Sequence, residues 1–138
     1  MGIARRQFDN ILSGIFTEGN TIRLFSTVPS ETTESGGVNM GQTYKIQAGD
    51  FNVSNGVVTS AKNMMFYLCE TTGGDGTAKG FGVYQGSGGA MLYFGSFKTP
   101  MEVGYNTVPT IKKYDASKGE GVRITMTSTE VEATAVAE

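Results

Sequence analysis

Histidine is absent from this 138-residue chain, and cysteine occurs only once. Without histidine there is no Ser-His-Asp or Cys-His arrangement, and the one thiol, Cys69, lacks its usual general base. A single cysteine also excludes a disulfide within the chain, so we interpret Cys69 as a small buried hydrophobic side chain. The sequence has no Walker-type phosphate loop, no zinc-ligand spacing and no dinucleotide-binding glycine motif. We therefore expect neither an enzymatic activity nor a cofactor.

Charge and long hydrophobic runs are also scarce. Charged residues make up 17% of the chain and the formal net charge is -2, so there is no basic footprint for nucleic acid. No apolar run approaches the roughly 20 residues that a membrane-spanning helix needs. Neither nucleic acid nor a membrane is an expected partner.

Paired carboxylates could still meet from distant positions. The nominal candidates are Asp50, Glu70, Asp75 and Glu102. Each is more simply interpreted as a solvated residue at a turn or strand end. Asp75 stands among glycines but lacks the alternating acidic ligands of a calcium loop, so no metal site is predicted.

Glycine is abundant, at 20 residues, and threonine and serine are plentiful. This composition indicates short strands and frequent turns. The length suits one domain. We expect a mainly β fold, an antiparallel β-sandwich with one N-terminal amphipathic α-helix, over residues 1–128. Residues 129–138 are small and acidic, and we expect a flexible tail or an arm ordered only against a neighbour.

The helix is predicted at residues 4–16, where large apolar side chains recur at helical spacing. They are Phe8, Ile11, Leu12, Ile15 and Phe16. The simpler interpretation is that this stripe packs on the sheet of the same domain. The alternative is a helix that docks onto a partner.

The centre of the fold is predicted at residues 81–95, two short apolar strands around a glycine-rich turn. The expected core of this hairpin is Phe81, Val83, Met91, Leu92 and Phe94. Further strands are expected at residues 21–27, 44–47, 51–54 and 57–59, the last two joined by an Asn55-Gly56 type I′ turn. Residues 63–70 favour a strand buried on both faces, 105–112 an edge strand, and 121–128 a half-exposed strand.

Four tyrosines could form an aromatic platform for a sugar: Tyr84, Tyr93, Tyr105 and Tyr114. Ordinary packing, with the hydroxyl at the surface, is the alternative. The sugar interpretation leads to a second functional hypothesis, a carbohydrate-binding module for a host surface glycan.

The chain resembles short structural proteins of tailed bacteriophages. Leu12-Ser13-Gly14-Ile15-Phe16 and Thr21-Ile22-Arg23-Leu24-Phe25 look like the opening of that family. Gly80-Phe81-Gly82-Val83-Tyr84 and the run Gly88-Gly89-Ala90-Met91-Leu92-Tyr93-Phe94-Gly95-Ser96-Phe97 look like its glycine-aromatic hairpin. The resemblance covers residues 6–128, and the hairpin is its specific part. Residues 104–121 depart from the family pattern, because Gly104-Tyr105-Asn106 replaces an expected Gly-Asp step.

The resemblance implies a non-enzymatic virion component assembled in the bacterial cytoplasm. It fits a minor tail or tail-fibre-associated protein and a capsid decoration protein equally. Its partners would be other virion proteins and further copies of itself in a closed homo-oligomer, most simply a trimer. Because a small sandwich has edge strands that must be covered, self-association also has a physical motive.

Overall fold

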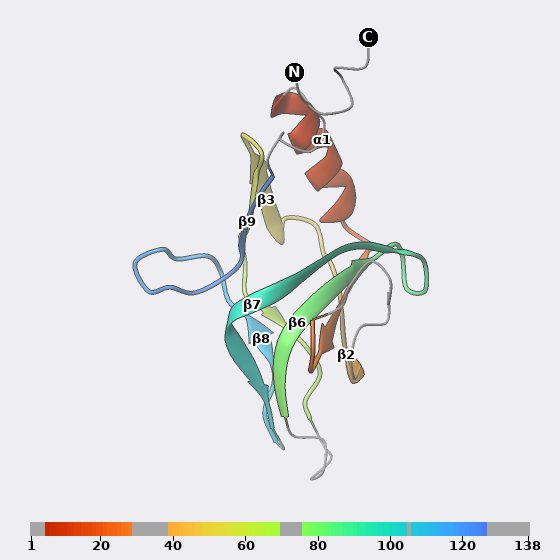
Figure 1. Cartoon of the computed structure of the whole chain (residues 1–138), viewed down its shortest axis with the longest axis vertical. Helices are drawn as coiled ribbons and strands as arrows, with labels where there is room; N and C mark the ends of the chain where they lie inside the picture. The colour runs from red at the N-terminus through yellow and green to blue at the C-terminus, as the bar shows by residue number, and fades with distance from the viewer. Residues whose placement is uncertain (1–4, 29–38, 70–75, 105, 127–138) are drawn as a thin grey trace, which may run out of the picture.

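A computed structural model of the chain describes residues 5–28, 39–69, 76–104 and 106–126. The protein is mainly β, with antiparallel sheets and one short N-terminal helix, as the sequence predicts. The elements in chain order are α1 (Arg5–Ile15), β1 (Thr21–Phe25), β2 (Asn39–Lys45), β3 (Phe51–Ser54), β4 (Val57–Ser60), β5 (Met64–Met65), β6 (Gly76–Tyr84), β7 (Met91–Val103), β8 (Thr110–Ile111) and β9 (Arg123–Thr125). Figure 1 shows α1 at one end of an elongated molecule, beside β3 and β9, with β6 and β7 extending toward the other end.

The strands form a four-stranded sheet in the order β2-β1-β6-β7, a three-stranded sheet in the order β3-β4-β9, and the two-stranded ribbon β5-β8. One hydrophobic core joins them. Ile22 and Val83 of the large sheet, Val58 of the small sheet and Met64 of the ribbon all belong to the same buried cluster. The sheets therefore stabilise one another through a shared interior rather than through separate cores.

The predicted helix is confirmed, and most of its apolar stripe packs within the domain. Phe8, Leu12 and Phe16 are buried and Ile15 is half-buried, whereas Ile11 is exposed. Asn20 caps the last turn of the helix. Its side-chain amide nitrogen donates to the carbonyl oxygens of Gly14 and Ile15 over 3.3 and 2.9 Å. Ile11 is therefore the one predicted docking residue that is exposed, and Ile15 is only partly accessible.

The helix also fixes the β3–β4 hairpin. Asn55 and Gly56 have φ angles of 55° and 75°, the left-handed pair that a type I′ turn requires, so that prediction is confirmed. The two backbone amides of this turn donate to the carboxylate of Asp9 on α1, over 3.2 and 2.7 Å. The turn is thereby held against the helix.

The central hairpin is confirmed as β6 and β7, but its predicted core is partly wrong. Residues directly opposite each other in an antiparallel pair share a face. Val83 lies opposite Tyr93, so Tyr93 faces the core and Leu92 and Phe94 face outward. Leu92 is 36% exposed, and neither Met91 nor Phe94 belongs to the core cluster. The bulge between Val83 and Tyr84 sets this register, which a reading of each strand alone cannot supply.

A second correction concerns residues 63–70, for which the sequence predicts a strand buried on both faces. Only Met64 and Met65 form a strand there, and Met65, Tyr67 and Leu68 are exposed. The reason is position. The segment pairs with β8 in a two-stranded ribbon, in which Met64 and Phe66 are buried on one face and Met65 and Tyr67 are exposed on the other. Glu70 lies outside the described residues.

The C-terminal strand has the predicted alternation, with half-buried Val122, Ile124 and Met126 and exposed Arg123 and Thr125. The expected edge strand at 105–112 is reduced to Thr110–Ile111. The predicted tail at 129–138 lies outside the described residues. Within the described part of the chain, no helix is long and apolar enough to cross a membrane.

Candidate functional site: a groove between two sheet edges

An open groove of about 1030 Å³ separates the last strands of the two larger sheets. Its walls are residues 95–101 of β7 on one side and residues 119–125, ending in β9, on the other. Consecutive residues line both walls, rather than every second residue, so strand edges rather than strand faces border the groove. We call this feature the edge groove.

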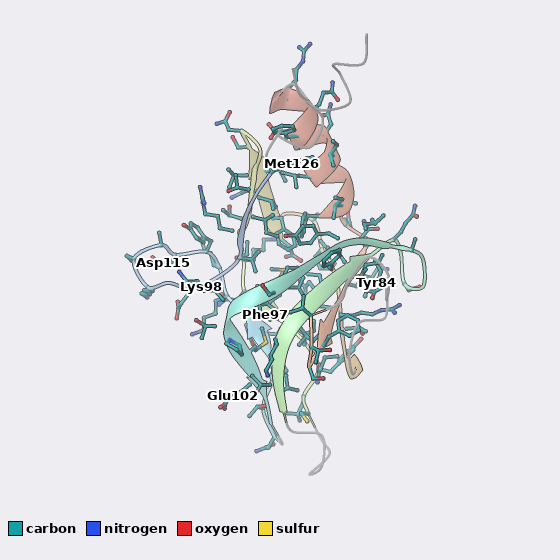
Figure 2. The ribbon with its side chains drawn as sticks, in the orientation of Figure 1. Tyr84, Phe97, Lys98, Glu102, Asp115 and Met126 are labelled. Atoms are coloured by element: carbon teal, nitrogen blue, oxygen red, sulfur yellow. The ribbon has the colours of Figure 1, made fainter. Side chains whose placement is uncertain are left out.

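The wall formed by β7 is sharply bent (Figure 1). Gly80 pairs with Ser96 and Ala78 pairs with Met101, so residues 97–100 face only Lys79 on β6. Extra residues on one strand of a ladder bend that strand. The bend carries Phe97 and Lys98 to the groove, as their labelled positions at the corner of β7 show in Figure 2.

The wall formed by β9 presents backbone groups that its own sheet does not use. The Met126 amide donates to the Gly56 carbonyl and the Ser60 amide to the Val122 carbonyl, so these two pairs are hydrogen-bonded pairs of the β4–β9 ladder. Because bonded and non-bonded pairs alternate in such a ladder, the N–H and C=O groups of Arg123 and Thr125 point away from β4. They face the edge groove.

Aromatic rings form the floor. Phe81 lies 5.1 Å from Phe97 and 5.9 Å from Tyr93, measured between ring centroids, and Tyr93 lies 5.6 Å from Phe16 of the helix. The Tyr93 phenol is neutral at pH 7, as any tyrosine is, and burial raises its pKa further. The floor is therefore apolar and uncharged.

The rim is mainly cationic. Lys98, Lys112 and Arg123 line the groove together with one acid, Glu120. Glu120 pairs with Lys112, with 2.9 Å between carboxylate oxygen and ammonium nitrogen. Among the described residues, neither Lys98 nor Arg123 has an ion-pair partner. An acidic ligand would meet two uncompensated positive charges here.

Ser60 positions the β9 side of the groove. Its hydroxyl donates to the Lys112 carbonyl over 2.7 Å and accepts the Val122 amide over 3.0 Å, and its carbonyl accepts the Tyr114 amide. Gly121 has a φ of 89°, and a Cβ there would lie 2.4 Å from the Tyr114 Cα. The loop can therefore approach so closely only with glycine at 121.

A second surface lies on the β5–β8 ribbon. Four large apolar side chains are exposed there: Met65, Tyr67, Leu68 and Val108. We call this surface the ribbon patch. Hydrogen bonds from the Phe66 amide to the Pro109 carbonyl and from the Asn106 amide to the Cys69 carbonyl extend the β5–β8 pairing and bring Tyr67 beside Val108.

The ribbon patch is anchored by a buried glutamine. The amide nitrogen of Gln42 donates to the Tyr67 carbonyl and its amide oxygen accepts the Tyr67 N–H, both over 2.9 Å. Gln42 thus replaces a neighbouring strand for this one residue. Met64, Phe66 and Cys69 point inward and are buried, so the expectation for Cys69 is confirmed.

The four predicted sugar-binding tyrosines do not form one platform. Tyr93 and Tyr114 both line the edge groove. Tyr84 is buried elsewhere, under the Arg23 guanidinium at 4.2 Å from the ring centroid, and Tyr105 lies outside the described residues. Sequence reasoning grouped them by residue type, but the sheet register separates Tyr84 from Tyr93.

Two of the four nominal acids, Asp50 and Glu102, lie within the described residues, and their surroundings differ. Asp50 is buried rather than solvated as expected, because its carboxylate accepts the Tyr44 hydroxyl over 2.6 Å and the Gln47 amide over 2.8 Å. Glu102 is exposed on β7, and Glu70 and Asp75 lie outside the described residues. Within the described ranges, no three acidic or cysteine side chains gather as a metal site would require.

Searches against protein-family models, curated proteins and solved structures find no match for this chain. Function is therefore inferred from the two surfaces and from the resemblance in sequence. Sequence reasoning missed both surfaces. A signal for the ribbon patch is present, since residues 64–69 are uncharged and dense in apolar side chains, but the same pattern also fits a strand buried on both faces.

Proposed function

We propose that this protein is a non-enzymatic structural component of a bacteriophage virion. It docks onto a protein of the particle, in the tail or on the capsid, through the ribbon patch, and it assembles with further copies of itself. Such a protein needs surfaces rather than a reaction centre. The lack of histidine and of catalytic motifs in the chain supports this assignment.

The ribbon patch is the observation that carries the proposal. Met65 and Tyr67 are 65% and 66% exposed, and Leu68 and Val108 lie beside them. Residues 64–69 and 106–111 contain no charged side chain. Apolar, charge-poor surfaces of this kind are typical of the centre of stable protein interfaces. The occupant we propose is accordingly an apolar surface of a particle protein.

The first experiment asks whether the protein belongs to the particle. We expect it in purified virions at a fixed stoichiometry, measured by quantitative mass spectrometry. Particles from a phage that lacks the gene should bind the purified protein when it is added to them. Absence from purified virions, together with no rebinding, would refute the proposal.

The second experiment tests the ribbon patch itself. The double variant Met65→Ser/Tyr67→Ser should fold normally and lose particle binding. The control is Leu92→Ser, which removes an apolar side chain that is 36% exposed on the outer face of β7. Equal loss of binding in both variants would show that the ribbon patch is not the docking surface.

A carbohydrate-binding role is the second candidate, and one observation favours it. The edge groove contains Tyr93, Tyr114 and Phe97, and its volume is near the upper end of the roughly 300–1,000 Å³ usual for ligand sites. Aromatic rings in an open groove are suited to sugar rings. Binding of host polysaccharide that is lost in Tyr114→Ala would support this role.

A further inference from the structure

We propose that the edge groove receives the C-terminal segment of a second copy, residues 127–138, as an added β-strand. This inference rests on the proposed function, because it names the contact by which a virion protein would assemble with itself. It concerns a different surface from the ribbon patch. The two can therefore fail separately.

The open backbone edge of β9 is the first reason. The N–H and C=O groups of Arg123 and Thr125 point into the groove, and no hydrogen bond to them comes from the described residues. Exposed edges of this kind pair with an extended segment, which gains main-chain hydrogen bonds. On the opposite wall, Pro100 lacks an N–H and Lys98 is charged, features that discourage pairing. The pairing edge is thus β9, and β7 supplies side-chain contacts.

Charge and pattern identify the segment. Residues 127–138 contain Glu130, Glu132 and Glu138 and no lysine or arginine. Lys98 and Arg123, on the rim, have no ion-pair partner in the described part of the chain. Val131, Ala133, Ala135 and Ala137 alternate with the other residues, so an extended segment would place small apolar side chains on one face. That face suits the apolar floor formed by Phe81, Tyr93 and Phe97.

The residues that follow Met126 favour pairing of the segment with β9 of a second copy over pairing with β9 of its own chain. To pair with its own β9, the segment would have to reverse direction immediately after Met126. Tight hairpins need residues that accept positive φ, above all Asn-Gly, Asp-Gly or Gly-Gly. Residues 127–130 are Thr, Ser, Thr and Glu. Passing the segment from each copy to the next requires no such turn, and it closes into a ring when the rotation fits.

The experiment unfolds equal amounts of unlabelled and ¹⁵N-labelled full-length protein in urea and refolds them together, so that copies of both kinds mix. A zero-length carbodiimide reagent then joins lysine to carboxylate, and the digest is read by mass spectrometry. We expect Lys98 joined to Glu130 or Glu132, with about half of these pairs carrying one light and one heavy peptide if chains exchange freely. Pairs that are only light-light or heavy-heavy would assign the segment to its own chain and overturn the proposal. The absence of Lys98–Glu130 and Lys98–Glu132 products would also overturn it.

Two matched variants of the full chain test the backbone pairing. Thr125→Pro removes an N–H that points into the groove, whereas Thr125→Val keeps it. Losing one such hydrogen bond should weaken self-association roughly tenfold in Thr125→Pro, by light scattering, with no change in Thr125→Val. Circular dichroism checks that both variants fold. Equal self-association in two folded variants would overturn the proposal.

If Thr125→Pro does not fold, a charge swap tests the same contact instead. Lys98→Glu/Arg123→Glu should weaken self-association roughly tenfold, because two attractions become repulsions. Combining it with Glu130→Lys/Glu132→Lys should restore self-association, and failure of this rescue would overturn the proposal. Dextran sulfate is the probe for a polysaccharide site. Binding of dextran sulfate in the groove without any crosslink to the segment would favour the carbohydrate role instead.

Particle binding separates this proposal from the proposed function. If the Thr125 and charge-swap variants associate normally yet Met65→Ser/Tyr67→Ser loses particle binding, only the groove assignment fails. If crosslinks form between copies but the protein is absent from virions, only the virion role fails.

Discussion

Residues 81–84 and residues 64–69 are both short, uncharged and rich in large apolar side chains, yet they differ in how far they are buried. All four residues of the first segment are buried, because β6 lies between β1 and β7 and both of its faces are covered. In the second segment Met64 and Phe66 are buried while Met65 and Tyr67 are exposed. Local composition is alike in the two segments. The number of neighbouring strands and the cover over each face decide burial.

The largest expected effect on stability comes from truncating a buried side chain in residues 81–84. Phe81→Ala should lower the free energy of unfolding by about 3–5 kcal/mol, because it removes a buried ring that packs on Tyr93 and Phe97. Urea unfolding followed by circular dichroism measures this change. Phe94→Ala, on the outward face of β7, should cost about 1 kcal/mol. Equal losses would show that both faces of the hairpin are core.

Gln42→Ala tests what holds the ribbon segment in place. It removes both hydrogen bonds to the backbone of Tyr67 and leaves buried polar groups unpaired, which should cost about 1–3 kcal/mol. Hydrogen exchange should also become faster at the Tyr67 amide than in the parent protein. The control is Gln47→Ala, because the exposed Gln47 side chain donates to the Lys45 carbonyl and to no other described residue. An unchanged exchange rate at Tyr67 would contradict the anchoring role.

A pH effect should arise beneath the ribbon, where Tyr44 packs against Phe66. Burial first, and then the hydrogen bond and charge of Asp50, raise the pKa of Tyr44 far above its usual value. The folded state therefore holds this proton more tightly than the unfolded state. That stabilisation is fully present below about pH 10 and is lost as the pH rises through the folded pKa.

Urea unfolding at pH 8 and above pH 10 measures this loss. Tyr44→Phe has no proton to lose at this position, so its stability should fall less over the same interval. Identical pH dependence in the two proteins would show that Tyr44 does not contribute.

The smallest expected effect on stability is at an exposed residue of the second segment, residues 64–69. Tyr67→Ala should change the free energy of unfolding by no more than about 0.5 kcal/mol, because its side chain faces solvent. The same substitution should reduce binding to particles. A loss of several kcal/mol in the isolated protein would mean that Tyr67 is a core residue and that the ribbon patch is not a docking surface.

Local features of the sequence determined the elements whose signals are themselves local. The spacing of Phe8, Leu12 and Phe16 predicted α1, because a helix repeats every 3.6 residues whatever it packs against. Asn55-Gly56 predicted its turn, because few residue pairs accept two positive φ angles. The alternation of Val122, Ile124 and Met126 predicted a half-buried strand for the same kind of reason.

Only the tertiary structure decided which faces and edges are covered. Whether Leu92 or Tyr93 enters the core depends on a register set by a bulge, since one residue of slip exchanges the two faces of a strand. The edge groove depends on β7 and β9, which residues 104–122 separate in the chain and which each end their own sheet. Strand order is a property of the assembled sheets, so the open edge of β9 has no signature in its own sequence. The apolar run at residues 64–69 is visible in the sequence, but it does not show which of its side chains are exposed.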